Sequence, residues 1–331
     1  MPSAPTDAFP RLVGDIGGTN ARFGLITRPD GRLHSIRSLP CAAFRSVAEL
    51  IEHYLKECGP SRPRHGALGI AAPLDGDLVR MTNREWAFSI GELRDQLRLA
   101  RLEVINDFTA LAMAIPALHD GDLRKVGGGA RVAGLTIGLL GPGTGLGVSG
   151  LVRCGGDDVA IEGEGGHVTL AASNAHEAAL LSRLAARYEH VSAERVLSGA
   201  GLVALYEAEA AVSGEPPAGL DAATISERGI AGSCALCAST LETFCAFLGT
   251  VASNLALTLG ARGGIYIGGG IVPKLGDYFL RSGFRARFEQ KGRYGAYLAA
   301  IPTYVIHAPH AGLTGAARLL QRRLDRPGPR Q

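Results

Sequence analysis

The sequence predicts an α/β fold, and three observations support this prediction. Segments typical of strands alternate with segments typical of helices along the chain. Two pairs of strands form hairpins whose tips are rich in glycine and threonine. Glycine accounts for 46 of the 331 residues, about twice its usual share, and it clusters in short turns between apolar runs. Such turns let a backbone approach a ligand closely.

The amino-terminal part predicts a hairpin over residues 11–26, with its turn at 17–20 (GGTN). A helix is expected over 47–56, because apolar side chains recur there on one face. Residues 67–72 predict a buried strand, ended by Pro73. A strand is expected over 103–105, with a helix over 108–115 directly after it.

A second hairpin is expected around a tip at 141–145 (GPGTG), flanked by apolar strands. It repeats the pattern of the first hairpin, which suggests two related β-rich lobes. Further on, helices are expected over 174–189 and 241–259, the first with Asn174 as its cap and Glu177 in the capping-box position. Gly260 is the expected stop of the second helix.

A short strand over 265–267 ends in the glycines 268–270. The tail after Leu320 is charged and contains proline, so we expect it to fray.

Composition excludes several classes of protein. The 34 basic and 31 acidic residues leave a formal charge of +3, which argues against a nucleic-acid platform. The first ten residues do not read as a secretion signal, and no apolar run is long enough to span a membrane. The six scattered cysteines do not suggest a disulfide framework, so a cytoplasmic location is expected. Cys234 and Cys237 form a lone C-x-x-C pair without further ligands, which we interpret as structural thiols.

The glycine turns fit none of the common nucleotide motifs. The P-loop pattern and the protein-kinase motifs are absent. The best dinucleotide candidate has Gly141 and Gly143 but Leu146 at its third glycine position. The remaining hypothesis is that the two hairpin tips bind phosphates through their amides and the hydroxyls of Thr19 and Thr144. The alternative is two ordinary tight hairpins.

Several acidic residues are candidates for chemistry. Asp15, at the end of the first strand, can hold the water shell of Mg²⁺. Asn106 and Asp107 lie between a strand and a helix. There Asp107 is either the helix N-cap or a general base directed into a cleft.

The string 162–167 (EGEGGH) places Glu164 and His167 among glycines, where they can hydrogen-bond vicinal hydroxyls. A metal site or a solvated turn are the alternatives. Glu194 taken alone is more typical of a helix-face residue paired with a neighbour.

These strings together resemble bacterial glucokinases, which belong to the hexokinase-like sugar kinases and share a superfamily with actin and the heat-shock chaperone ATPases. The resemblance extends from about Leu12 to Leu320. Its motifs are LVGDIGGTNARF (12–23), MTN (81–83), WAFSI (86–90), INDFTA (105–110), GTGLGV (143–148), GEGGHV (163–168), VSAERVLSG (191–199) and GGGIVP (268–273). No single motif is specific, but their order and spacing are.

The resemblance implies a two-lobed, actin-like (ribonuclease H-like) fold with a central cleft. The small lobe would comprise residues 1–117 and about 308–331, and the large lobe residues 118–307. It implies Asp107 as the catalytic base, with Asn106, Glu164, His167 and Glu194 as ligands of the sugar hydroxyls, which replaces the helix-face interpretation of Glu194. The nucleotide would contact three segments, comprising Gly14, Asp15, Ile16, Gly17, Gly18 and Thr19, then Gly143, Thr144 and Gly145, then Gly269 and Gly270.

The implied activity is ATP- and Mg²⁺-dependent phosphorylation of D-glucose at its 6-hydroxyl, the first step of glycolysis, by a homodimer. No protein side chain is expected as a direct metal ligand, with Asp15 acting through water, and the cysteine-rich zinc motif of some relatives is absent. Alternatives are a kinase for another hexose such as mannose or N-acetylglucosamine, an ATPase switch, or a non-catalytic sugar sensor. Neither nucleic acid nor a membrane is an expected partner.

Overall fold

The computed structural model describes residues 9–81, 85–154 and 156–325. Thr82 and Asn83 of the expected motifs lie outside the described residues. The chain divides into two compact units, which are described separately below. Unit 1 contains residues 1–118 and 308–331, and unit 2 contains residues 119–307.

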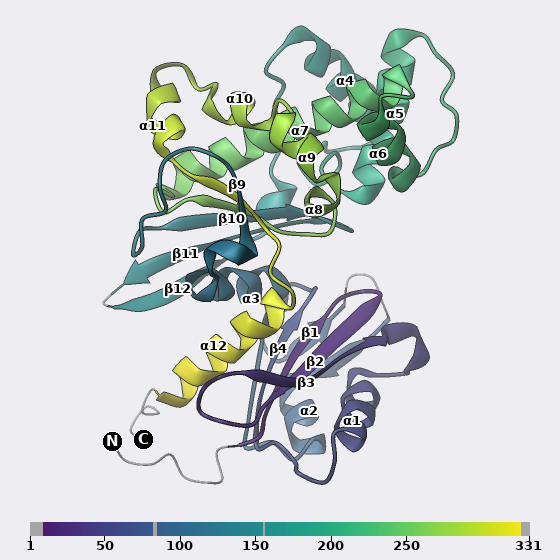
Figure 1. Cartoon of the computed structure of the whole chain (residues 1–331). Helices are drawn as coiled ribbons and strands as arrows, with labels where there is room; N and C mark the ends of the chain where they lie inside the picture. Colours follow the sequence, from purple (N-terminus) through teal and green to yellow (C-terminus); the bar gives the residue numbers. More distant parts are fainter. Residues whose placement is uncertain (1–8, 82–84, 155, 326–331) are drawn as a thin grey trace. The chain divides into compact units, whose positions relative to one another are not determined.

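Unit 1 is built on a five-stranded sheet in the order β3-β2-β1-β4-β8 (Figure 1). Its strands are β1 (Arg11–Ile16), β2 (Asn20–Ile26), β3 (Leu33–Pro40), β4 (His65–Ile70) and β8 (Arg101–Asn106). The strands β1 and β2 form the expected antiparallel hairpin, and β4 and β8 continue the sheet in parallel with β1. A small second sheet contains β5 (Leu74–Asp75), β6 (Leu78–Arg80) and β7 (Ala87–Ser89).

Helices cover both faces of the main sheet of unit 1. They are α1 (Val47–Glu57), α2 (Ile90–Gln96), α3 (Asp107–Ala114) and α12 (Ala311–Asp325), and the 3-10 turns are Cys41–Ala43 and Ile115–Ala117. Successive strand residues point to opposite faces. Leu12 therefore joins the apolar cluster that includes α1, whereas Val13 joins the cluster with Leu313 and Leu320 of α12. The expected fraying after Leu320 is wrong as far as Asp325, because Leu320 is fully buried and α12 continues past it.

Unit 2 is built on a six-stranded sheet in the order β12-β11-β10-β13-β14-β9. Its strands are β9 (Leu123–Gly127), β10 (Ile137–Pro142), β11 (Leu146–Cys154), β12 (Asp157–Glu162), β13 (Ile265–Ile267) and β14 (Thr303–Ile306). The strands β10 and β11 form the second expected hairpin, with its tip at 143–145 because Gly141 and Pro142 belong to β10. Apart from the added edge strand β9, the order and directions repeat those of unit 1, which confirms the internal repeat.

The helices of unit 2 are α4 (Ala175–Ala185), α5 (Gly199–Ser213), α6 (Ala222–Ala231), α7 (Ala235–Leu259), α8 (Val272–Leu275), α9 (Asp277–Arg281), α10 (Phe284–Glu289) and α11 (Gly295–Ala300). Short 3-10 turns occupy Asp120–Asp122, Gly165–His167 and Gly292–Tyr294. Figure 1 shows α7 among α4, α5, α6 and α10 on one side of the sheet. The side chains of these helices and of β10 and β13 form one large apolar cluster.

The helix α7 starts six residues earlier than the sequence predicts. Cys234 is its N-cap, and the Cys234 sulfur accepts a hydrogen bond from the Cys237 N–H at 3.4 Å. This is a structural role, and all six cysteines are free thiols. Gly260 ends the helix in a left-handed conformation, as expected. Among the described residues α7 is the one helix long and apolar enough to cross a membrane, but 67% of its most apolar window is buried within the protein, as in a core helix.

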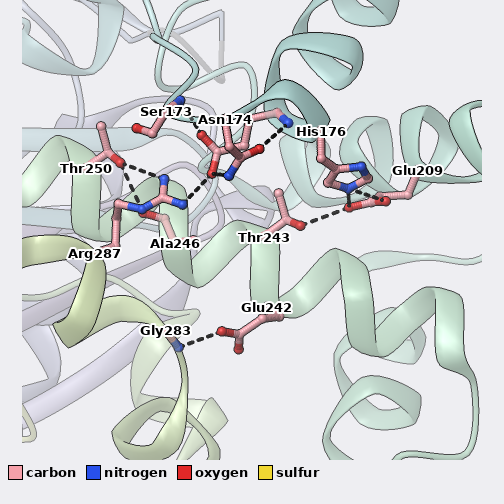
Figure 2. Close-up of polar contacts among 11 residues, drawn as sticks. Ser173, Asn174, His176, Glu209, Glu242, Thr243, Ala246, Thr250, Gly283 and Arg287 are labelled. Atoms are coloured by element: carbon pink, nitrogen blue, oxygen red, sulfur yellow. Dashed lines mark hydrogen bonds and ion pairs between the residues drawn. The ribbon is translucent and has the colours of Figure 1, made fainter. Parts of the chain in front are cut away.

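Two buried carboxylates hold the helices of unit 2 together (Figure 2). Glu177 of α4 pairs with Arg287 of α10 at 2.6 Å. Glu209 of α5 accepts from Thr243 of α7 at 2.9 Å and pairs with His176 at 3.0 Å. Asn174 caps α4 as predicted, but Glu177 accepts from the N–H of Ser173, one residue before the position that a capping box requires.

Candidate active site

The tip of the first hairpin is a closed turn at the carboxyl end of β1. The Gly17 N–H donates to the Asn20 carbonyl at 3.0 Å. The buried residue Cys41 fixes the tip through two hydrogen bonds. Its N–H donates to the Thr19 carbonyl at 2.9 Å, and its thiol donates to the Gly17 carbonyl at 3.4 Å. Thr19 is exposed, so its hydroxyl is available to a ligand. Sequence reasoning did not find Cys41, since no motif marks it.

Other candidates of the first segment lie inside the sheet. Gly14 is in the middle of β1, where a Cβ would lie 2.6 Å from Leu68 and 2.9 Å from Phe23. Ile16 is fully buried. Their positions show packing roles that support the tip, whereas Gly17, Gly18 and Thr19 form the turn itself.

Asp15 lies on β1 opposite Arg22 of β2, and their charged groups are 3.7 Å apart. Burial raises the pKa of the Asp15 carboxyl, and the nearby charges of Arg22 and His310 lower it in part. Gly312 of α12 lies directly against it, since a Cβ there would be 3.0 Å from the Asp15 carboxylate. One partly exposed carboxylate fits Mg²⁺ that keeps its waters and is bound mainly by substrate phosphates. No cluster of three or more potential metal-ligating side chains is found among the described residues.

The N-terminus of α3 corrects one expectation about Asp107. The N-cap is Asn106, whose side-chain oxygen accepts from the N–H groups of Phe108 at 2.9 Å and Thr109 at 3.2 Å. Asp107 is the first residue of the helix, so its interpretation as the N-cap is wrong. The Asn106 side-chain NH₂ donates to the Ala72 carbonyl at 3.4 Å, a long bond that leaves donor capacity for a ligand.

The first tip and Asp107 share one edge of the sheet of unit 1. Ile16, Ile70 and Asn106 are in register at the carboxyl ends of the parallel strands β1, β4 and β8. Neighbouring strands lie about 4.8 Å apart, so β1 and β8 are separated by roughly 10 Å. Ligands of open α/β sheets bind at this edge.

The tip of the second hairpin is closed in a similar way within unit 2. The Gly143 N–H donates to the Gly145 carbonyl at 2.8 Å, and the Gly199 N–H donates to the Gly143 carbonyl at 2.9 Å. The N–H groups of Thr144 and Gly145 have no acceptor among the described residues. They are therefore the amides of this tip that can bind a phosphate.

The third glycine segment packs against the base of the second tip. Gly268 donates its N–H to Leu140 at 2.9 Å, and the N–H of Ile271 donates to Pro142 at 3.2 Å. Gly269 has a φ of 79°, a conformation that favours glycine, and a side chain there would overlap Pro142. The N–H groups of Gly269 and Gly270 lack an acceptor in the described part of the chain, and they add to the donors of the second tip.

Glu164 and His167 are joined by a single 3-10 turn after β12. The His167 N–H donates to the Glu164 carbonyl at 3.0 Å, and the imidazole and carboxylate are 4.0 Å apart. Both side chains are more than half exposed. Gly165 and Gly166 pack against Val148 and Leu146 of β11, where side chains at either position would overlap them. The turn is therefore held against the second hairpin, which argues against the solvated-turn alternative.

Glu194 lies in a turn before α5, so its interpretation as a helix-face residue is wrong. Its N–H donates to the Gly166 carbonyl at 2.8 Å, and one carboxylate oxygen accepts from the Leu146 N–H at 2.8 Å. Unit 2 thus brings together Glu164, His167, Glu194, the second tip and Gly268–Gly270. Unit 1 brings together Asp15, the first tip, Asn106 and Asp107.

The fold described above, with glycine turns and a carboxylate at the ends of strands, is typical of a phosphoryl-transferring enzyme. Comparison with known proteins gives the family. The glucokinase family model matches residues 12–323, so the chain belongs to the glucokinase family.

Curated relatives agree with this assignment. The chain is similar to the glucokinase of Aromatoleum aromaticum, with 57% identity over 98% of both chains. It is 50% identical to the glucokinase of Chromobacterium violaceum, over 96% of this chain and 91% of the relative.

Solved structures show the same fold. A glucokinase from an Antarctic psychrotroph superposes with a TM-score of 0.86 at 40% identity, over 95% of this chain and 99% of its own. A glucokinase from Balamuthia mandrillaris, at 22% identity and a TM-score of 0.79, shows the shared fold alone. The predicted α/β fold of the actin-like sugar kinases is thereby confirmed.

Proposed function

We propose that Asp107 is the general base of this glucokinase. As a member of the family, the chain transfers the γ-phosphoryl group of ATP to D-glucose, giving D-glucose 6-phosphate and ADP. The observation that carries the proposal is the position of Asp107. It begins α3 at the same sheet edge as the first glycine tip, while Asn106 provides the helix cap in its place.

In the proposed reaction the Asp107 carboxylate accepts the proton of the glucose 6-hydroxyl. The sugar oxygen forms a bond to the γ-phosphorus while the bond from that phosphorus to the bridging oxygen of ADP breaks. The positive end of α3 favours the anionic form of Asp107 and so weakens it as a base. This is tolerable because phosphoryl transfer passes through a loose transition state, in which the proton moves as the reaction proceeds.

The proposal assigns four residues as sugar ligands. Asn106 offers its side-chain NH₂, Glu164 and Glu194 offer acceptor oxygens, and His167 offers its imidazole. Polar groups that hydrogen-bond a bound sugar reject sugars with a misplaced hydroxyl, because the groups are then left unpaired in the complex. The proposal therefore includes a preference for glucose over mannose and N-acetylglucosamine.

The nucleotide phosphates are proposed to contact the two hairpin tips and Gly269–Gly270. The amides of Thr144, Gly145, Gly269 and Gly270 and the hydroxyls of Thr19 and Thr144 are the donors. When bound, Mg²⁺ supplies positive charge to the transferring phosphoryl group. Asp15 would hold it through water.

The wider setting of the enzyme is part of the same proposal. We infer that it acts in the cytoplasm, in the first step of glycolysis, as a homodimer without a nucleic-acid or membrane partner. The near-neutral charge balance and the free cysteines support the cellular part. Light scattering of the purified protein tests the oligomeric state.

A panel of hexoses tests the activity and its specificity. ADP release is measured with glucose, mannose, N-acetylglucosamine or no sugar, and the sugar phosphate is measured in parallel. The proposal predicts ADP and glucose 6-phosphate in equal amounts with glucose and little ADP without sugar. Sugar-independent ADP release would indicate an ATPase switch, and glucose binding without product would indicate a sensor.

A further inference from the structure

Glu194 contacts the second hairpin through its side chain. Its Oε2 accepts from the N–H of Leu146, the residue that follows the tip, at 2.8 Å. Gly145 lies directly against the same oxygen, and a Cβ at this position would overlap it. The tip is therefore shaped around the Glu194 carboxylate.

The backbone of Glu194 ties a third segment to the same place. Its N–H donates to the Gly166 carbonyl at 2.8 Å, within the turn that carries Glu164 and His167. Gly166 in turn packs on the carbonyl of Leu146. Three segments that are distant in sequence thus meet at one residue, all within unit 2.

The carboxylate has capacity for two tasks. A carboxylate has two oxygens, each of which can accept more than one hydrogen bond. Oε2 accepts from Leu146, whereas no donor to Oε1 is found among the described residues. The Leu146 N–H donates to Glu194 and is therefore not free to bind a phosphate. The amides of Thr144 and Gly145 remain as the phosphate donors of this tip.

We propose that Glu194 is a positioning residue for the second phosphate tip in addition to a sugar ligand, so that one carboxylate couples nucleotide binding to sugar binding. The sugar half rests on the proposed function, whereas the tip half rests on the contacts within unit 2. A sugar hydroxyl on Oε1 restricts the carboxylate and, through Oε2, the tip. Coupling between two binding sites is reciprocal, so nucleotide binding at the tip must also strengthen sugar binding.

The test is the affinity for a non-hydrolysable ATP analogue, AMPPNP with Mg²⁺, measured by calorimetry without glucose. Glu194→Ala removes the acceptor and should weaken AMPPNP binding roughly 10- to 100-fold, the range for a hydrogen bond to a charged group. Glu194→Gln retains an acceptor oxygen and should stay within about 3-fold of the wild type. Glu164→Ala is the matched control, since it removes a proposed sugar ligand that makes no side-chain contact with the tip, and it should leave AMPPNP affinity unchanged.

Gly145→Ala is a second, independent variant. Its φ is not in the left-handed region, so alanine is compatible with the backbone, but the added methyl group displaces the carboxylate from Leu146. It should weaken AMPPNP binding as Glu194→Ala does. If Glu194→Ala does not fold, as judged by circular dichroism, Gly145→Ala decides the question.

Wild-type AMPPNP affinity in Glu194→Ala, or in Gly145→Ala, would overturn the proposal. So would an equal loss in Glu194→Gln and Glu194→Ala, because the conservative variant keeps the acceptor. The glucose dissociation constant separates this outcome from failure of the proposed function. Unchanged glucose affinity in Glu164→Ala and Glu194→Ala would remove their sugar roles, while the AMPPNP result would still decide the positioning role.

Discussion

At the scale of single residues, Asn106 and Asp107 divide two tasks that either side chain can perform. Both residue types are good N-caps, so the sequence leaves the choice between them open. The extended backbone of Asn106 decides it, because its side chain then reaches the N–H groups of Phe108 and Thr109. Asp107 is left at the first helical position, where the proposal assigns it the role of general base.

A second residue of this kind is Asp15, whose buried carboxyl is predicted to lower the free energy of unfolding at neutral pH. Burial raises the pKa of its carboxyl, so the folded protein holds this proton more tightly than the unfolded chain does. The contribution of this carboxyl to the free energy of unfolding is fully present below the pKa that Asp has in the unfolded chain. It is lost as the pH rises through the higher pKa of the folded protein. At neutral pH the ionised form therefore lowers the free energy of unfolding.

Asp15→Asn should thus raise the free energy of unfolding at neutral pH while it lowers kcat with MgATP. The lost pair with Arg22 matters little, since at 3.7 Å and with Arg22 half exposed it contributes about 0–1 kcal/mol. Urea unfolding is measured at neutral pH and again at acid pH, where the difference from the wild type should shrink. A less stable variant at neutral pH would contradict this account.

At the scale of elements, the position of α3 depends on its contact with α12. Gly315 of α12 lies against the Ala110 carbonyl of α3, and a Cβ there would overlap that oxygen. Gly69 of β4 also leaves room for α3, since a Cβ at Gly69 would lie 3.1 Å from the Cβ of Ala110. Two glycines therefore let α3, with Asp107 at its start, lie close to both neighbours.

Gly315→Ala should lower the free energy of unfolding by about 1–3 kcal/mol, as overpacking does, and should also reduce kcat because α3 must shift. Thermal unfolding and steady-state kinetics test both effects. Gly121→Ala is the control, because nothing lies within 4 Å of its Cβ position. Equal behaviour of the two variants would show that the α3–α12 contact does not position the site.

The helices of unit 2 depend on a buried ion pair between Glu177 and Arg287, with side-chain exposures of 3% and 13% (Figure 2). Removal of one partner leaves the other charge buried and unpaired, which typically costs about 3–5 kcal/mol. Arg287→Ala should therefore lower the free energy of unfolding by roughly that amount. The control is Arg187→Ala, because Arg187 and its partner Glu207 are both exposed and loss of their pair should cost about 1 kcal/mol or less. If Arg287→Ala changes the free energy of unfolding by urea only slightly, the buried Glu177–Arg287 pair does not stabilise unit 2 as proposed.

The sequence predicts most elements of this fold but not all of their ends. The periodicity of apolar residues and the glycines at turns predict both hairpins, α1 and the strands before the glycine turns. They fail at Cys234, because a thiol is a weak cap that sequence rules do not mark, and after Leu320, because burial of α12 against the sheet extends a helix with a polar end.

At the scale of the whole molecule, each unit uses the same strand order to place a glycine tip beside the carboxyl ends of parallel strands. The repeat of the two tips was predictable, since each hairpin is local in sequence. The links from Cys41 to the first tip and from Glu194 to the second were not, because they join segments separated by tens of residues. The proposed sugar-binding role of Glu194 was accessible through family resemblance alone.

The central claim is that the Asp107 carboxylate accepts the proton of the glucose 6-hydroxyl. The most direct test is Asp107→Asn, which keeps the size of the side chain and an oxygen that can accept from the Phe108 N–H. The claim predicts that kcat falls by about 10²- to 10⁴-fold, the usual contribution of a general base, while calorimetry shows glucose affinity within about 3-fold of the wild type. A kcat close to that of the wild type, in a variant that binds glucose normally, would contradict it.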